Sequence, residues 1–362
     1  MKKILCLIDT LGIGGAERQM VGLAVLLKKK GYDIDLVSYH KEDFYAPLAR
    51  KGGVEPIVLQ VENTPFSKFK AVRSFIKQHG KYDCIITYKG GPNVIGCILK
   101  LIGLKSRVIV SERITTQVLT KSVRTRFWMY RFADYIVPNA YSQGDFISLH
   151  YPGYKKKIVP ITNFTDTAHF TPLKQEKEKN SINILTAARI AKQKNLINYL
   201  EAIALLKEKG IKDVHFDWYG DLQRGEEAYG EEVKRKVAEL KLEDMISFYP
   251  NVANIVEHYQ RCDIFCLPSN FEGYPNVVCE AMSCGKPIVC SRVCDNPRIV
   301  SEGQNGLFFD PKNAEDIADK IVQMINMPHE VRNQWGEKSR EIAVEMLSEE
   351  AFVQKYIRLI EQ

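Results

Sequence analysis

The sequence contains no run of apolar residues that approaches the roughly 20 needed for a membrane-spanning helix. The apolar stretch near its start, Ile4 to Ile8, is interrupted by Asp9 before it reaches the length of a signal-peptide core. Low-complexity segments and short internal repeats are also absent. With 45% hydrophobic and 26% charged residues among 362, the composition is typical of a globular protein. We therefore expect a cytoplasmic, non-spanning protein of about two domains.

The cysteines lack the Cys-x-x-Cys spacing of a zinc ribbon or a redox site. Nine are present, and six of them fall between Cys262 and Cys294, which raises the hypothesis of a metal site. Cys266 and Cys290 lie in apolar runs, however, where a thiol packs as a small hydrophobic side chain. We favour packing over metal binding, and the lack of a disulfide framework agrees with a reducing compartment.

Charge is divided unevenly along the chain. Residues 1–165 hold 26 Lys and Arg against 12 Asp and Glu, whereas residues 166–362 hold 25 against 32. The basic half could be a solvated face, a nucleic-acid groove or a surface for anionic lipid. Residues 121–131 combine basic side chains with Phe127 and Trp128, which suits the headgroup region of an anionic membrane. Because no element that reads nucleic acid is visible, we favour the membrane over nucleic acid.

Short apolar runs alternate with longer helical patterns, which is typical of βαβ units and parallel sheets. The strands expected in the first half are Lys3–Ile8, Ile34–Ser38, Pro56–Leu59, Cys84–Thr87, Val108–Ser111 and Tyr135–Pro138. Those expected in the second half are Asn183–Ala187, His215–Tyr219, Ile246–Phe248, Ile264–Pro268 and Pro287–Ser291. The sequence therefore predicts an α/β fold with two Rossmann-like, doubly wound parallel-sheet domains that face each other across a cleft.

The polar, charged segment Thr171–Ser181 has no apolar periodicity and is predicted to be the linker. We assign residues 1–165 to a basic N-terminal domain and residues 166–347 to a C-terminal domain. Residues 348–362 form an amphipathic helix that can pack back on the N-terminal domain.

Two loops between a strand and a helix carry candidate phosphate ligands. Gly14 and Gly15 precede a helix, where glycines let backbone amides approach a phosphate or an anionic transition state. Glu17 stands where a dinucleotide fingerprint needs Gly or Ala, which disfavours a nicotinamide enzyme, and a tight turn without a ligand is the alternative. After the first strand of the second half, Arg189 and Lys194 can point at a diphosphate, although loop cations are often only solvated.

A third segment, residues 269–287, is the most specific. It carries Glu272 in a loop and Glu280 on the helix that follows. Two carboxylates near a positive helix end can hold sugar hydroxyls while backbone amides receive an anion. The turn that supplies those amides consists of Gly273, Tyr274, Pro275 and Asn276.

The spacing of Glu272 and Glu280 within Glu-Gly-Tyr-Pro-Asn-Val-Val-Cys-Glu resembles the paired-glutamate motif of family 4 glycosyltransferases, including those that build envelope polysaccharides. The resemblance extends over nearly the whole chain and takes in the Gly14-Gly15 loop and the Arg189/Lys194 pair. It implies the GT-B fold and retaining transfer from a nucleotide sugar. It also implies an N-terminal domain that binds the acceptor and a C-terminal domain that binds the donor.

The resemblance also implies roles for single residues. Arg189 and Lys194 would neutralise the leaving diphosphate in place of a metal, and Glu272 would hold the donor sugar. Glu280 would bind the ribose. Gly14 and Gly15 would lie near the diphosphate or the acceptor.

Two departures from the family pattern concern the base and the sugar. The nucleobase would lie near Asn251 and Val252, where glycine is common in place of Asn251. Many relatives carry a histidine near the donor sugar where this chain has Glu112 and Arg113. We expect one of these two side chains to replace it, on the acceptor side.

Asp33-Ile-Asp35 matches the metal-binding Asp-x-Asp of the other large glycosyltransferase fold. It adjoins an apolar strand with nothing nearby to complete a site, so we predict no metal and no other cofactor.

The predicted function is a metal-independent, hexosyltransferase-type enzyme. It would use a nucleoside diphosphate sugar, UDP-linked, and a glycan or lipid-diphosphate-linked saccharide as acceptor. The predicted location is the inner face of the cell membrane. The alternatives are a nucleotide-sugar 2-epimerase of the same architecture and a non-enzymatic protein that binds membrane or nucleic acid.

Overall fold

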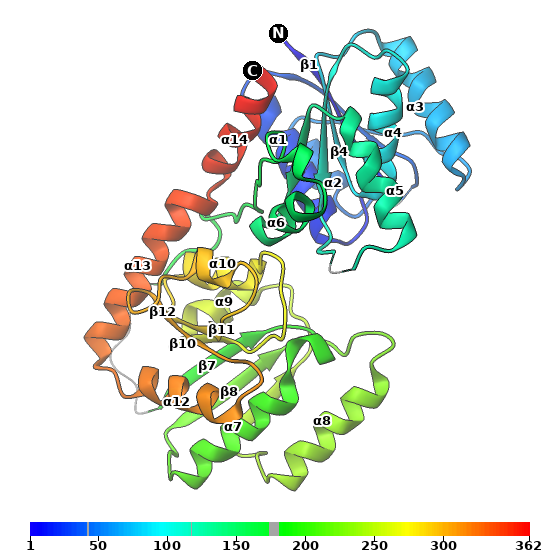
Figure 1. The fold of residues 1–362 in the computed structure, drawn as a ribbon. Helices are drawn as coiled ribbons and strands as arrows, with labels where there is room; N and C mark the ends of the chain where they lie inside the picture. The colour runs from blue at the N-terminus through cyan, green and yellow to red at the C-terminus, as the bar shows by residue number, and fades with distance from the viewer. Residues whose placement is uncertain (42, 117, 174–180) are drawn as a thin grey trace. The chain divides into compact units, whose positions relative to one another are not determined.

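The computed structural model describes residues 1–41, 43–116, 118–173 and 181–362, which form two compact units (Figure 1). Unit 1 comprises Met1–Phe164 and Glu349–Gln362, and unit 2 comprises Thr165–Ser348. Both divisions lie within one residue of those expected from the sequence.

The predicted linker is displaced, because the chain enters unit 2 at Thr165, before Thr171–Ser181 begins. The Arg340 guanidinium donates hydrogen bonds to the carbonyls of Thr167 (2.9 Å) and Phe170 (2.8 Å), and it thereby holds this segment to unit 2. Most of the predicted linker, residues 174–180, lies outside the described residues.

Unit 1 is built on a six-stranded parallel sheet with the order β3-β2-β1-β4-β5-β6. Its strands are β1 Lys3–Ile8, β2 Asp33–Ser38, β3 Pro56–Val58, β4 Cys84–Tyr88, β5 Arg107–Glu112 and β6 Tyr135–Pro138. Its helices are α1 Gly15–Lys29, α2 Ala46–Lys51, α3 Pro65–His79, α4 Gly90–Leu101, α5 Lys121–Met129, α6 Tyr141–His150 and α14 Glu349–Glu361, with 3-10 turns η1 Tyr130–Phe132 and η2 Pro152–Tyr154.

The apolar run of β1 is continuous because both of its faces are covered. Ile4, Cys6 and Ile8 pack into one hydrophobic core, whereas the alternate residues Leu5 and Leu7 pack into a second core on the opposite face. This alternation is the period of two expected for a strand.

The C-terminal helix α14 belongs to unit 1 and lies beside α1 (Figure 1). Phe352, Val353, Tyr356, Leu359 and Ile360 are buried in the core that also contains β1. Residues 358 positions apart in sequence are therefore neighbours, because the Lys2 ammonium donates a hydrogen bond to the Ile360 carbonyl at 3.1 Å.

Unit 2 repeats the architecture with the strand order β12-β11-β10-β7-β8-β9, again with parallel pairing. Its strands are β7 Ile182–Ala187, β8 Val214–Tyr219, β9 Ile246–Tyr249, β10 Ile264–Leu267, β11 Ile288–Ser291 and β12 Gly306–Phe309. Its helices are α7 Leu196–Glu208, α8 Glu227–Glu239, α9 Ile255–Arg261, α10 Asn276–Ser283, α11 Asn296–Ile299, α12 Ala314–Ile325 and α13 His329–Leu347, with the 3-10 turn η3 Lys192–Lys194.

The prediction of two doubly wound α/β domains is confirmed, and each predicted strand is present with ends that differ by at most one residue. Strand β12 was not predicted. It is short and begins at Gly306, where a Cβ would lie 2.5 Å from the Ile288 carbonyl oxygen of the neighbouring strand. The glycine that allows this close approach also makes the sequence look like a turn.

Eight of the nine cysteines are buried, and Cys294 is exposed. No group of three His, Cys, Asp or Glu side chains that could hold a metal occurs in the part of the chain that the structure describes. Across the same residues, no helix combines the length and apolar character needed to cross a membrane.

Candidate functional site

The strand order of unit 2 marks one place as the natural ligand site. The chain proceeds outward in opposite directions from the adjacent strands β7 and β10, and ligands of open α/β sheets bind beyond the carboxyl ends of strands at such a switch point. Residues 188–195 follow β7 and residues 268–275 follow β10. The topology therefore brings the two predicted site segments to one edge of the sheet.

Hydrogen bonds fasten these two loops together. The Asn270 amide donates to the Gln193 carbonyl at 2.8 Å, and the Gln193 side chain donates to the Phe271 carbonyl at 2.9 Å. Asn195 has a left-handed backbone (φ 60°) and donates to the Pro268 carbonyl at 3.0 Å. Sequence reasoning missed Gln193 and Asn195, although asparagine before a helix is a known signal for a left-handed residue.

An ion pair joins the loops at their centre. The Lys194 Nζ lies 2.5 Å from the Glu272 Oε1, and the two side chains are only 13% and 9% exposed. Arg189 is exposed and makes no hydrogen bond or ion pair with the residues that the structure describes. The edge thus carries one cation held by a buried carboxylate and one cation available to a ligand.

The loop after β10 leads into the amino terminus of α10. Pro275 precedes the helix, which begins at Asn276, and this N-cap residue makes no side-chain capping hydrogen bond. Gly273 is partly exposed and Tyr274 is buried. The backbone amides at a helix start carry a partial positive charge and favour an anion there.

Glu280 lies on α10 and is 8% exposed. The Tyr259 hydroxyl of α9 donates a hydrogen bond to Glu280 Oε2 at 3.1 Å. Burial, together with the adjacent carboxylate, raises the pKa of Tyr259 well above its usual value, so the phenol stays a donor. No sequence signal identified Tyr259, which is 21 residues from Glu280.

Asn251 and Val252 follow β9, the outer neighbour of β8 in this sheet. Asn251 is exposed, whereas Val252 is half-buried. The Asp221 carboxylate accepts hydrogen bonds from the Asn251 backbone amide (3.2 Å) and from its side-chain Nδ2 (2.5 Å). Asp221 was not predicted, and it fixes the side chain that replaces the common glycine.

Gly14 and Gly15 lie in unit 1, between β1 and α1. A Cβ on Gly14 would lie 2.2 Å from a carboxylate oxygen of Glu17. Glu17 is 6% exposed and forms an ion pair with Lys89. A side chain at position 14 would therefore displace the Glu17 carboxylate from this place.

Glu112 is 2% exposed at the end of β5. Its carboxylate pairs with Arg126 at 3.1 Å and accepts a hydrogen bond from the Tyr130 hydroxyl. Burial raises the pKa of Glu112, and the Arg126 charge opposes that shift.

Arg113 is also committed to partners inside unit 1. Its guanidinium donates to Asn163 Oδ1 at 3.0 Å and to the Tyr356 hydroxyl of α14 at 2.8 Å, and it lies 3.9 Å from the Tyr88 ring centroid. The side chain predicted for the acceptor side thus joins α14 to the edge of the sheet.

Asp33 and Asp35 lie on β2, and Asp35 is paired within unit 1. It accepts a hydrogen bond from the Tyr82 hydroxyl at 2.6 Å and lies 3.3 Å from Lys3. These contacts hold the Asp35 carboxylate within unit 1.

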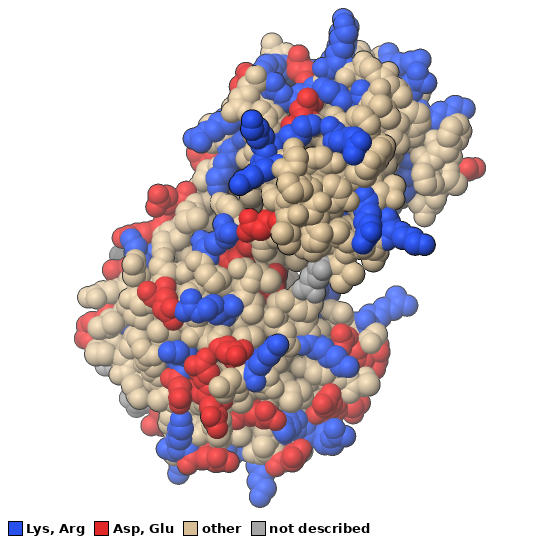
Figure 2. Space-filling model, in the orientation of Figure 1, with Lys and Arg blue, Asp and Glu red and all other residues tan. Residues whose placement is uncertain are grey.

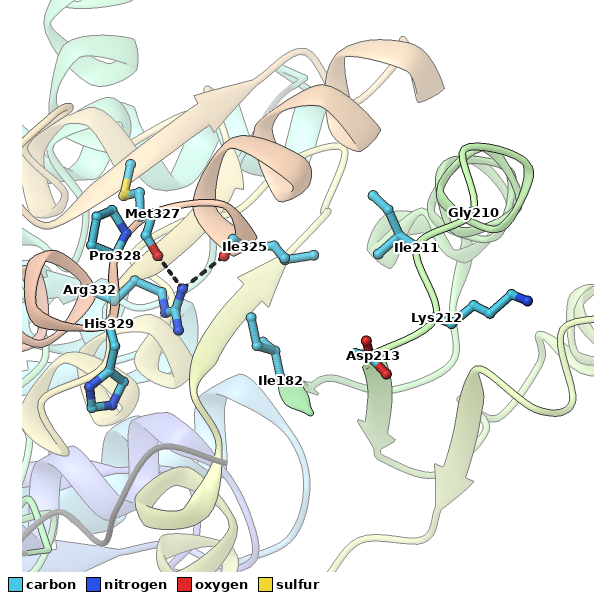
Figure 3. Close-up of a pocket in the computed structure, with 10 residues that line it drawn as sticks. All are labelled: Ile182, Gly210, Ile211, Lys212, Asp213, Ile325, Met327, Pro328, His329 and Arg332. Atoms are coloured by element: carbon cyan, nitrogen blue, oxygen red, sulfur yellow. Dashed lines mark hydrogen bonds between the residues drawn. The ribbon is translucent and has the colours of Figure 1, made fainter. Parts of the chain in front are cut away.

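A pocket of about 400 Å³ lies elsewhere in unit 2, at the amino end of β7 (Figure 3). Ile182 opens this strand, so the pocket is at the sheet edge opposite the switch-point loops. Arg332 occupies one side and donates to the carbonyls of Ile325 (2.8 Å) and Met327 (2.5 Å), which closes the end of α12 (Figure 3). The Arg332 guanidinium thus caps carbonyl groups at the end of α12. None of the predicted site residues lines the pocket.

Comparison with known proteins relates the second half of the chain to a family of enzymes. Residues 170–342, which include the switch-point site, match the family described as glycosyl transferases group 1. A Haemophilus influenzae protein described as an uncharacterized glycosyltransferase is 26% identical and aligns with 99% of this chain and 98% of its own length. Residues 170–342 are therefore similar to the group 1 glycosyltransferases.

Another relative also aligns along most of its length. The Campylobacter jejuni GalNAc-alpha-(1->4)-GalNAc-alpha-(1->3)-diNAcBac-PP-undecaprenol alpha-1,4-N-acetyl-D-galactosaminyltransferase is 25% identical over 90% of this chain and 89% of its own.

Solved structures resemble it at lower identity. Anabaena HepE in complex with UDP has a TM-score of 0.84 at 19% identity over 100% of both chains. A Rickettsia africae glycosyltransferase has a TM-score of 0.85 at 18% identity over 99% and 98%. The chain has the GT-B fold, as predicted.

Proposed function

We propose that this glycosyltransferase moves a sugar from a UDP-linked donor to a hydroxyl of a glycan or lipid-diphosphate-linked saccharide, with retention of the anomeric configuration. The observation that carries the proposal is the Lys194–Glu272 pair at the switch point of unit 2. A nucleotide sugar contains both a diphosphate and sugar hydroxyls, and this edge presents cations and carboxylates for the two parts.

Arg189 and Lys194 neutralise the charge that develops on the leaving diphosphate. Arg189 is exposed and has no ion-pair partner among the described side chains, so binding a phosphate costs it no existing contact. Its planar guanidinium can make two parallel hydrogen bonds to phosphate oxygens. The first amides of α10 add to the positive potential. Fixed cations of this kind can supply the electrostatic stabilisation that a divalent metal supplies in other enzymes.

The two glutamates have different partners and therefore different roles. Glu272 contacts Lys194 at the reacting end of the donor and accepts hydrogen bonds from the donor sugar. Glu280, held by Tyr259, accepts hydrogen bonds from the ribose. A buried carboxylate fixed by a neutral donor keeps its remaining oxygen in one orientation, which suits recognition of a ribose hydroxyl.

Similar proteins support the choice of substrates. HepE was crystallised with UDP, and the Campylobacter relative is named for an acceptor linked to undecaprenol. Retention follows from the resemblance of the Glu272 to Glu280 segment to family 4.

The basic surface of unit 1 supports peripheral membrane contact, at the inner face of the cell membrane. Figure 2 shows Lys and Arg gathered over this unit, with fewer Asp and Glu among them. Near α5, Trp128 is 44% exposed and Ile114 and Val118 are 61% and 69% exposed. Exposed apolar side chains beside Lys121 and Arg124 suit an anionic lipid surface. Sedimentation with anionic vesicles should fall at high salt, and equal sedimentation with neutral vesicles would contradict this contact.

Substitution of the two glutamates tests the donor site. Glu272→Ala should lower kcat strongly, because a misplaced sugar loses the orientation needed in the transition state. Glu280→Ala should weaken UDP binding by about 1.5–3 kcal/mol, the value for a hydrogen bond to a charged group. Calorimetry with UDP and steady-state kinetics distinguish the two effects, with the exposed Glu257→Ala on α9 as a control. Unchanged UDP affinity in Glu280→Ala would show that the ribose assignment is wrong.

Activity in excess chelator tests the role of the two cations. Transfer should persist, because Arg189 and Lys194 occupy the place of a metal. Complete loss that added metal reverses would contradict the mechanism. A screen of UDP-sugars by thermal stabilisation identifies the donor, and formation of a free epimerised sugar nucleotide would favour the 2-epimerase instead.

A further inference from the structure

The pocket at the amino end of β7 is separate from the proposed donor site of unit 2. Its volume of about 400 Å³ is in the range of small-molecule sites. It is lined by the first residue of β7, the connection from α7 to β8, and the connection from α12 to α13 with the first turn of α13. Arg189, Lys194 and Glu272 lie beyond the carboxyl ends of the strands, so a small ligand in the pocket does not contact them.

Arg332 brings a buried positive charge to this pocket. The residue is 9% exposed, and it makes no ion pair with any Asp or Glu in the described part of the chain. Its two hydrogen bonds, to the carbonyls of Ile325 and Met327, are both donated by Nη1. Buried charges are usually paired, because neutral carbonyls replace the lost hydration of a guanidinium only in part. Capping of α12 therefore leaves Arg332 without an anion.

The capping hydrogen bonds leave one edge of the guanidinium for a ligand. Nε and Nη2 make no hydrogen bond with the residues that the structure describes. Neither nitrogen is among the enclosed side-chain atoms that lack a partner, so both remain accessible from the pocket that Arg332 lines. Their two parallel N–H groups match the two oxygens of a carboxylate or a phosphate. The start of the 19-residue helix α13 at His329 adds a partial positive charge.

The middle of the pocket is apolar. The side chains of Ile182, Ile211 and Ile325 line it, and all three are half-buried and pack against the core of unit 2. A ligand that covers them removes apolar surface from water. Arg332 and residues 212–213 lie on opposite sides of Ile182 (Figure 3). An anion held by Arg332 is therefore kept away from the carboxylate of residue 213.

These features specify an amphiphilic anion. Inorganic phosphate satisfies only the cationic side, and a neutral apolar molecule leaves Arg332 without a counter-ion. We propose that this pocket is a second ligand site, which binds an oxyanion, a carboxylate or a phosphate monoester, carried on an apolar body. The oxyanion accepts hydrogen bonds from Nε and Nη2 of Arg332, and the apolar body covers the three isoleucines. The site goes beyond the proposed function, because it lies at the opposite edge of the sheet from the residues assigned to the donor.

Calorimetry on the full chain tests the pocket with four probes. 3-Phenylpropionate and phenyl phosphate carry an oxyanion on an apolar body. Inorganic phosphate carries the anion alone, and 3-phenyl-1-propanol carries the apolar body alone. At least one of the first two should bind about tenfold or more tightly than either of the others, since only these probes use both parts of the site. The tighter of the two identifies the preferred oxyanion.

Two substitutions remove the two parts of the site separately. Arg332→Lys keeps a positive charge for the α12 carbonyls but loses the paired N–H groups, so it should weaken binding by about tenfold or more. Its matched control is Arg235→Lys, at an exposed arginine of α8. Ile211→Ala removes apolar contact and should weaken binding by about threefold or more. Its control is Val322→Ala, at a half-buried valine of α12 outside the pocket. Ile211→Ala leaves the capping arginine intact, so it tests the site even if Arg332→Lys does not fold.

UDP separates this site from the donor site. The affinity for the anionic probes should be the same with and without saturating UDP, because the two sites lie at opposite edges of the sheet. Loss of probe binding in UDP would place the probe in the donor site and overturn the proposal. Equal affinity for 3-phenyl-1-propanol and the anionic probes would also overturn it, as would Arg332→Lys binding that equals that of Arg235→Lys. Probe binding without any binding of UDP contradicts the proposed function and still supports the second site.

Discussion

Lys194→Met removes the cation paired with the Glu272 carboxylate and keeps most of the volume of the side chain. The side chains of Glu272 and Lys194 are 9% and 13% exposed, with 2.5 Å between the paired atoms. The variant therefore leaves a carboxylate in a largely buried position without its counter-ion. Glu272→Gln leaves the Lys194 ammonium without its carboxylate. The lysine stem can turn this ammonium toward water, so Glu272→Gln should destabilise the protein less than Lys194→Met.

The expected size follows from the burial of the pair. Removing one partner of a fully buried ion pair costs about 3–5 kcal/mol. Because both side chains keep some exposure, we expect the lower end, about 3 kcal/mol. For a unit the size of unit 2, each kcal/mol shifts the melting midpoint by about 2–4 °C, so the midpoint should fall by about 6–12 °C.

Thermal unfolding followed by tryptophan fluorescence measures this loss, because the buried Trp218 belongs to unit 2. Lys192→Met, an exposed lysine in the same 3-10 turn, is the matched control and should change the midpoint little. The double variant Lys194→Met/Glu272→Gln should recover most of the loss, since no unpaired buried charge remains. If Lys194→Met melts within about 1 °C of the control, the Glu272 carboxylate does not depend on Lys194 as its counter-ion, and the expected destabilisation is refuted.

Three further outcomes are expected. Gly220→Ala should destabilise unit 2 by at least about 2 kcal/mol, because φ is 154° and the new Cβ would lie 2.1 Å from the Ala188 carbonyl oxygen. The control Gly225→Ala, at a residue with φ 87° and open space around it, should cost about 1 kcal/mol. Equal melting midpoints for the two variants would contradict this prediction. A thiol reagent should label Cys294 alone in the native protein, since the other cysteines are buried; a mass spectrum with a second fast adduct would show otherwise. Burial raises the pKa of Asp9 in the folded state, so ionisation of this carboxyl group opposes folding. Asp9→Asn should therefore be more stable to urea than the parent at neutral pH, and the difference in stability should vanish below about pH 4. A variant that is less stable than the parent at neutral pH would contradict this prediction.

Much of the candidate site was predictable because its residues follow strands. The carboxyl end of a parallel strand is where ligands bind, and the ends of β7 and β10 were readable from apolar runs bounded by polar residues. Arg189, Lys194 and Glu272 were found in this way. Tyr259 and Asp221 were not, because a single tyrosine or aspartate in an ordinary context carries no local signal of its partner.

For the candidate residues on the acceptor side, the sequence did not reveal which groups surround each side chain. Glu112 and Arg113 were singled out because many relatives carry a histidine at this place, and the structure gives both side chains partners inside unit 1. One of those partners is Tyr356, which is 243 residues away. Asp9 was noted only as a break in an apolar run. The charges that act on its carboxylate come from Lys89, Lys68, His40 and Glu17 on other segments, and position along the chain does not reveal them.

The sequence by itself determined the fold class, the strands to within one residue except β12, and the basic character of the first half, because periodicity and charge are local properties of the chain. The tertiary structure decided which strands are neighbours, and hence that β7 lies against β10 and β1 against β4. It paired Lys194 with Glu272 across 78 residues and placed α14 in the core of unit 1. These features depend on which distant segments pack together, and the same local pattern is compatible with several such arrangements. Only the folded chain selects the one in which the buried charges find their partners.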